Sequence, residues 1–178
     1  MKYSLQVLTD EITHANIDEL IEFRFANGLA FPTSYIDFAQ QFGYGVTCGE
    51  FLFYVPMGNY RDSFSIRSEA IKGTYNDVLE DHNNLWFTLE PDVDFEKLKG
   101  LIPFASSENG YYLFWDSTES FVGEMDIYIT DFRGLGFIKV AKNLYELIEK
   151  MTSHIEFKEV FPLFRQNPLP ATFKSVKI

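Results

Sequence analysis

The spacing of apolar residues changes near residue 100, and this change constrains the fold more than any other feature of the chain. Before it, apolar residues recur at helical spacing, as at Tyr35, Phe38, Ala39 and Phe42. From Leu101 onward the period approaches two in the segments LIPFA, GYYLFWD, MDIYITD and GFIKVA, which short polar turns separate. Such short connections favour antiparallel neighbours. The sequence therefore predicts an α+β domain in which helices pack an antiparallel sheet of about four to six strands.

Further elements are predicted on both sides of these strands. Asn16 and Gly28 are a candidate N-cap and stop for a first helix, and Pro32 opens a second helix that Gly43 ends. The remaining expectations are strands over 3–8, 50–56 and 85–91, a helix over 61–84, a turn or short helix over 92–100 and an amphipathic helix over 143–151 capped by Asn143.

The length of 178 residues fits one domain, and 46% hydrophobic residues are enough for a real core. We predict a single domain over residues 1–160. Residues 161–178 contain Pro162, Pro168 and Pro170 and have no clear period. They are expected to form a tail that packs on the domain or extends from it.

The formal net charge of −11 opposes general affinity for nucleic acid and for anionic lipid. A basic protein partner is the natural complement, although a negative surface also serves solubility alone. Cys48 is the only cysteine and cannot form an internal disulfide, and no segment approaches the roughly 20 apolar residues of a membrane span. The expected location is the cytoplasm, with no nucleic acid and no membrane among the partners.

The negative charge is concentrated in the middle of the chain. No Lys or Arg occurs between Lys72 and Lys97, or between Lys99 and Arg133, whereas the region from Lys139 onward is richer in cations. The acids of these two intervals are Asp77, Glu80, Asp81, Glu90, Asp92, Asp94 and Glu96, followed by Glu108, Asp116, Glu119, Glu124, Asp126 and Asp131. This asymmetry can focus the field on one face and steer a cationic protein, although scattered solvated acids are an equal alternative.

The sequence contains no clear set of catalytic or metal-binding residues. Cys48 has no flanking pattern typical of a nucleophile, and the three histidines are far apart in the sequence. EDHNN at residues 80–84 is a weak metal-ligand group, and acid pairs such as Asp116 with Glu124 or Asp126 with Asp131 are a weak glycosidase pattern. The sequence contains neither a GxxxxGK(S/T) phosphate-binding loop nor the GxSxG nucleophile elbow of serine hydrolases. We therefore expect no enzyme, no metal and no cofactor.

Three stretches in order resemble the SUKH superfamily, which includes Smi/Knr-like cell-wall regulators and toxin-immunity proteins. They are FPTSYIDFAQQFGYGVTCGEFLFYVP, LIPFASSENGYYLFWDSTE and FIKVAKNLYELIEKM. The resemblance covers most of residues 15–151. It departs from the family pattern in the GYG turn after the second helix, in an insertion-like segment at about 61–84 and in the Pro-containing tail.

The resemblance implies a small α+β domain without catalysis. Bacterial members look like immunity proteins that neutralise a toxin domain, often a nuclease, and a fungal branch is similar to regulators of cell-wall glucan synthesis. An acidic domain that covers a basic nuclease competes with nucleic acid for the positive surface that attracts phosphate. We predict stoichiometric binding of a basic toxin domain through an acidic face, with a regulatory or scaffolding adaptor as the alternative.

The predicted contact surface combines acids near the sheet edges with aromatic anchors, because aromatics and a few desolvated charges dominate interface energies. Each aromatic has a competing role in the core. The predicted contact residues are Tyr44, Glu50, Tyr112, Trp115, Asp116, Glu119, Glu124, Asp126, Tyr128 and Asp131.

Overall fold

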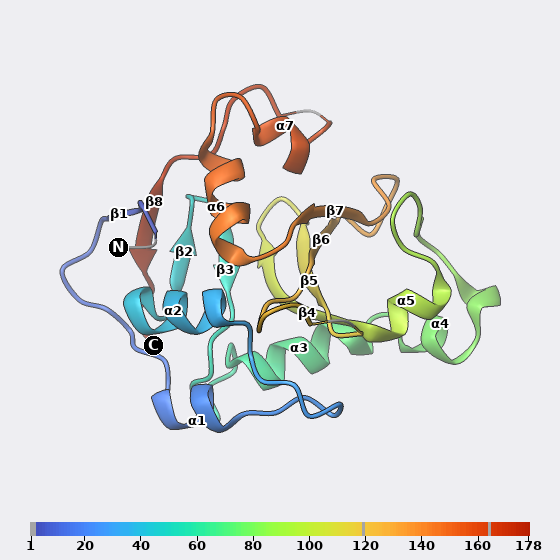
Figure 1. Ribbon diagram of the computed structural model, residues 1–178, viewed down its shortest axis with the longest axis horizontal. Helices are drawn as coiled ribbons and strands as arrows, with labels where there is room; N and C mark the ends of the chain where they lie inside the picture. Colours follow the sequence, from blue (N-terminus) through green and yellow to red (C-terminus); the bar gives the residue numbers. More distant parts are fainter. Residues whose placement is uncertain (1–2, 119, 164) are drawn as a thin grey trace.

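The computed structural model describes residues 3–118, 120–163 and 165–178, and its centre is a sheet of eight strands (Figure 1). The strand order is β1-β8-β2-β3-β4-β5-β6-β7. The β1–β8 pair is parallel, and the other neighbours are antiparallel. Helices pack this sheet, so the predicted α+β class is confirmed, with more strands than the four to six expected.

The four strands predicted after residue 100 are confirmed as β4 to β7. The sequence prediction did not include β2, which directly follows a helix, or β8, which lies in the expected tail. The strands are β1 (Gln6–Val7), β2 (Gly45–Thr47), β3 (Phe51–Phe53), β4 (Leu101–Ser107), β5 (Tyr112–Asp116), β6 (Ile127–Thr130), β7 (Ile138–Ala141) and β8 (Thr172–Ser175).

The predicted N-caps Asn16 and Asn143 and the predicted helix end at Gly43 are confirmed, whereas the first helix ends at Glu22, well before the predicted stop at Gly28. Asn16 and Asn143 each accept a hydrogen bond from a backbone N–H in the first turn of α1 and α6, and Gly43 follows α2 with a φ of 68°. The helices are α1 (Ile17–Glu22), α2 (Thr33–Phe42), α3 (Phe64–Gly73), α4 (Asn76–Glu80), the 3₁₀ helix η1 (His82–Asn84), α5 (Phe95–Gly100), α6 (Leu144–Thr152) and α7 (Phe157–Val160).

Two predictions between residues 61 and 91 are wrong. The single helix over 61–84 is broken into α3, α4 and η1, because the chain turns after Gly73 and buries Tyr75. The strand over 85–91 does not form. Backbone hydrogen bonds join Thr88 and Leu89 to the β6–β7 connection, but Pro91 has no N–H with which to continue a ladder.

Both faces of the central strand β5 are buried. Trp115 stacks on Phe104 with ring centroids 4.1 Å apart, and Tyr35 of α2 meets the same indole edge-on at 4.8 Å. Phe114 points to the opposite face, because side chains alternate along a strand, and it packs on Phe137 at 5.4 Å. The sheet therefore has an aromatic core on each side at β5.

The C-terminal segment supplies an internal strand of the sheet. β8 lies between β1 and β2, and its Phe173 packs on Phe42 of α2 with ring centroids 5.2 Å apart. β1 and the C-terminal end of the chain both lie at the left of the molecule in Figure 1. A domain boundary at residue 160 stays a prediction.

Candidate protein-binding surface

The predicted aromatic anchors lie mainly in the interior. Tyr44, Trp115 and Tyr128 are buried, and Tyr112 is half-buried on β5. The hydroxyl of Tyr44 donates to Asp62 Oδ2 at 2.9 Å, and Tyr128 Oη accepts from Lys97 Nζ at 2.9 Å. Their polar atoms are thus used within the chain, as is usual for buried tyrosines.

Three predicted contact acids have cationic partners in the chain itself. Asp116 is buried, with Oδ2 3.4 Å from Lys97 Nζ. Asp126 forms an ion pair with Lys139, and Glu50 forms one with Arg165. The hydrogen bond to Asp126 and the opposite charge of that carboxylate raise the pKa of Lys139, so its ammonium remains charged at neutral pH.

Two other predicted acids hold backbone segments. Glu124 accepts hydrogen bonds from Ser34 N at 2.8 Å and from Ser34 Oγ at 2.6 Å, and so caps α2. Asp131 Oδ1 accepts from the backbone N–H of Arg133 at 2.8 Å. Glu119 lies outside the described residues. Each of the described acids is therefore engaged by a partner within the chain, and a contact with another protein stays a prediction for each.

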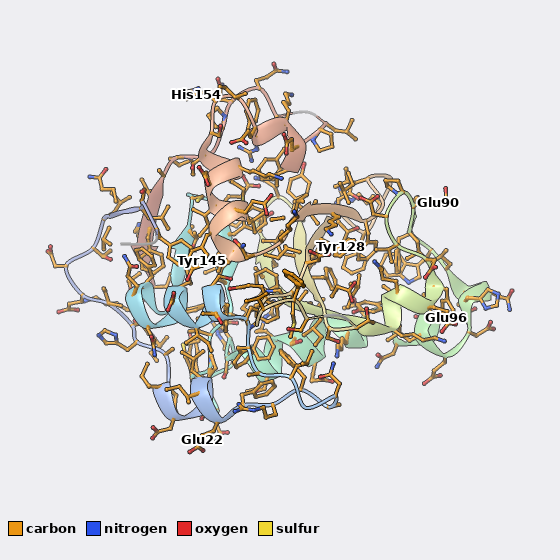
Figure 2. The ribbon with its side chains drawn as sticks, in the orientation of Figure 1. Glu22, Glu90, Glu96, Tyr128, Tyr145 and His154 are labelled. Carbon is orange, nitrogen blue, oxygen red and sulfur yellow. The ribbon has the colours of Figure 1, made fainter. Side chains whose placement is uncertain are left out.

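A different exposed acidic surface lies at the end of the molecule that carries α4 and α5. We call residues 76–96 the acidic lobe; it projects at the right of Figure 1, and Figure 2 shows Glu90 and Glu96 there. The lobe contains no Lys or Arg, and its acids are all exposed. They are Asp77, Glu80, Asp81, Glu90, Asp92, Asp94 and Glu96.

Most of these carboxylates keep their negative charge uncompensated. Asp81, Asp92 and Asp94 accept hydrogen bonds from backbone N–H groups, which carry no net charge. Glu96 pairs with Lys99 at 2.8 Å. For Asp77, Glu80 and Glu90, no ion pair occurs within the part of the chain that the structure describes. The lobe is therefore a net negative surface.

The acidic lobe also exposes two large apolar side chains. Trp86 is 52% exposed and Leu85 is 41% exposed. The indole of Trp86 packs edge-on against Phe87 at 4.7 Å and is tilted over Phe132 at 5.8 Å. Tryptophan held in this way, with part of its surface open, is the residue type most enriched among interface hot spots.

Buried residues beneath the lobe fix its position. Phe87 is buried and meets Phe132 edge-on at 5.0 Å. Phe137 N donates to Leu89 O at 3.0 Å, and Asp92 N donates to Phe137 O at 3.1 Å. A Cβ on Gly136, whose φ is +70°, would lie 1.6 Å from Glu90 O, so only glycine allows this close approach.

The sequence contained one signal for this surface, the run of acids without cations. It did not reveal that Leu85 and Trp86 are exposed, because LWFTLEP has the composition of a buried strand. Their exposure depends on the long-range contacts of the neighbouring Phe87 with Phe132 and Phe137.

Reactive side chains are not assembled near the lobe. Burial raises the pKa of the Cys48 thiol to about 12, so the thiolate is scarce at neutral pH. His82 packs against the ring of Phe95 at 5.2 Å. Among the described residues, no group of three or more His, Cys, Asp or Glu is arranged to hold a metal, and no helix is long and apolar enough to span a membrane.

Comparison with known proteins gives one family match. The model of the SUKH_6 family, described as SMI1-KNR4 cell-wall, matches residues 17–148. This range includes α1, the whole acidic lobe and the first half of α6. No curated protein and no solved structure gives a significant match.

Proposed function

Since the chain belongs to the SUKH_6 family of SMI1-KNR4 cell-wall proteins, we propose that it is a non-catalytic domain that binds another protein. More specifically, we propose an immunity protein that neutralises a basic toxin domain, such as a nuclease, by stoichiometric binding through the acidic lobe. The observation that carries this proposal is the exposed Trp86 within a lobe that has seven acids and no Lys or Arg.

The two features of the lobe have separate roles in binding. Its carboxylates attract a cationic surface over a distance of about one Debye length, roughly 8 Å at physiological salt. They therefore raise the rate of association and orient the partner. Trp86 and Leu85 act after the encounter, because burying their exposed area stabilises the complex and slows dissociation.

A nuclease suits this surface because it must attract phosphate with a positive active-site surface. A domain of net charge −11 that covers this surface blocks access to nucleic acid without any chemistry of its own. The alternative is a regulatory or scaffolding adaptor, which family membership supports equally. The same lobe would then bind a basic host protein.

The test compares two triple variants with the same change in net charge. The lobe variant carries Asp77→Asn, Glu80→Gln and Glu90→Gln, and the matched control carries Asp10→Asn, Glu108→Gln and Glu149→Gln at exposed positions elsewhere. Association with a purified candidate toxin domain, chosen from any encoded beside the gene, is measured at low salt. We expect the lobe variant to associate about tenfold more slowly and the control to change little.

The variant Trp86→Ala tests the apolar part of the surface. We expect it to weaken binding by roughly tenfold or more, mainly through faster dissociation. Equal effects of the two triple variants, together with unchanged dissociation of Trp86→Ala, would reject the lobe as the interface. Co-expression with the toxin distinguishes the two functions, because an immunity protein restores growth and an adaptor does not.

A further inference from the structure

A second exposed apolar feature lies on the connection between β5 and β6. Phe121 and Glu124 exchange backbone hydrogen bonds of 3.0 Å around a two-residue turn. The central residues Val122 and Gly123 have φ values of 53° and 76°. Positive φ at both positions is typical of a type I′ turn. We call residues 121–124 the Phe121 turn.

The Phe121 turn is unfavourable for the isolated domain in two respects. Its first central position prefers Asn, Asp or Gly, and a β-branched residue at positive φ is a steric outlier. In addition, Phe121 is 83% exposed and Val122 is 84% exposed. Backbone strain together with exposed apolar side chains is a combination found at binding sites, where the gain appears only in the complex.

A pocket of about 640 Å³ opens beside this turn. This volume is within the usual range of ligand-binding pockets. Tyr145 lines this pocket, and Figure 2 shows it over the body of the molecule, whereas Glu90 and Glu96 lie at the acidic lobe. The lining residues are Thr33, Phe121, Val122, Glu124, Asp126, Lys142, Asn143 and Tyr145. We call this cavity the turn pocket.

The walls of the turn pocket combine rings with carboxylates. Phe121 and Tyr145 supply aromatic faces, Glu124 and Asp126 supply two carboxylates, and Lys142 supplies an ammonium. Asp126 is also paired with Lys139, so the carboxylates contribute hydrogen-bond acceptors and not a net negative charge. Glu124 is held by Ser34 and Asp126 by Lys139, so both carboxylates are fixed in position. An ionised carboxylate has about four acceptor sites, which lets it hold a structural donor and a ligand donor together.

These walls match one kind of side chain best. The guanidinium of arginine is planar, stacks on aromatic rings and donates in a fork to carboxylates, and its methylene stem packs on apolar surface. We propose that the turn pocket binds an arginine-bearing segment of a protein partner. Phe121 and Val122 contact the stem, and Glu124 and Asp126 accept from the guanidinium.

The proposal deepens the proposed function, because it names a side chain that the basic partner would present. The turn pocket and the acidic lobe are also linked structurally. Lys139 pairs through its ammonium with Asp126 of the pocket, and its backbone N–H donates to Asp92 of the lobe at 2.8 Å. A partner anchored by arginine in the pocket would therefore lie beside the lobe.

The first test uses a peptide and needs no biological partner. The probe is acetyl-Leu-Arg-Leu-amide, titrated into the full chain and followed by NMR chemical shifts of Phe121, Val122 and Tyr145. The matched controls are the same peptide with citrulline, an uncharged isostere, and with glutamate. We expect saturable shifts at these residues with a millimolar dissociation constant for the arginine peptide, and at least fivefold weaker binding of both controls.

The second test separates binding from folding. Val122→Asn creates the preferred Asn-Gly sequence of a type I′ turn, so we expect a higher melting temperature together with several-fold weaker binding of the arginine peptide. Phe121→Ser should also weaken binding. Ile155→Ser, which replaces a side chain 89% exposed elsewhere, is the control and should leave binding unchanged.

Three results would overturn the proposal: shifts scattered away from the pocket, equal binding of the citrulline peptide, or full peptide binding by both turn variants. Failure of the lobe variants to affect the toxin domain would leave these peptide results intact. The two proposals can therefore fail independently.

Discussion

At the scale of single residues, Glu124 provides the N-terminal cap that helix α2 lacks in its own sequence. Pro32 precedes the helix and has no side-chain acceptor, so Ser34 N donates to Glu124 instead. Ser34 is fully buried, and its hydroxyl also accepts from Leu144 N at 3.0 Å. We expect Glu124→Ala to lower the free energy of unfolding in urea by about 2–3 kcal/mol, because buried donors lose a charged acceptor.

Glu108→Ala is the matched control for this prediction, since it removes an exposed acid from the β4–β5 turn and should cost no more than about 0.5 kcal/mol. Similar losses for both variants would contradict the capping role. Caps supplied by the adjacent residue, Asn16 and Asn143, were predictable from the sequence. The cap supplied by Glu124 was not, because 90 positions separate it from Ser34.

At the scale of elements, β8 stabilises the sheet although it belongs to the expected tail. It pairs with β1 on one side and β2 on the other, and Phe173 is fully buried. We expect deletion of residues 171–178 to cost at least about 4 kcal/mol, since loss of one buried Phe side chain alone costs about 3–5 kcal/mol. Deletion of residues 177–178 removes an exposed Lys177–Glu11 pair and should change little. Full stability of the longer deletion would show that the tail is dispensable.

Helices and strands were predicted correctly where the sequence has a clear periodic pattern of apolar residues. The helix at α6 and the strands β4 to β7 have a strong local period, and the sequence indicated all of them. β2 follows directly after helix α2, and β8 lies in a segment with three prolines and no clear period, so neither strand stands out in the sequence. The segment 61–84 has a helical composition, but burial of Tyr75 against Phe114 and Phe132 turns the chain. These misses arise from long-range packing that local propensity does not contain.

At the scale of the whole molecule, the sequence predicted the uneven distribution of charge along the chain. It did not predict where on the surface the exposed acids lie. The sequence distinguishes two acidic intervals, but the structure assigns them different roles. Acids of the second interval, such as Asp116 and Asp126, pair with lysines, whereas the first interval forms the exposed acidic lobe. A linear count of charges does not separate these cases, because the lysines at 97 and 139 lie outside the second interval in the sequence and beside it in space.

Salt should therefore affect stability and binding in opposite directions. Raising NaCl screens the repulsion among Asp77, Glu80 and Glu90, so we expect the melting temperature to rise by a few degrees between about 20 mM and 500 mM. Over the same range, association with a basic partner should slow, because steering is screened as well. The lobe variant with all three acids neutralised should reduce both dependences, and the Asp10, Glu108 and Glu149 variant should reduce neither as strongly. A melting temperature that falls with salt would mean that the surface ion pairs, and not repulsion within the lobe, dominate the electrostatics of the fold.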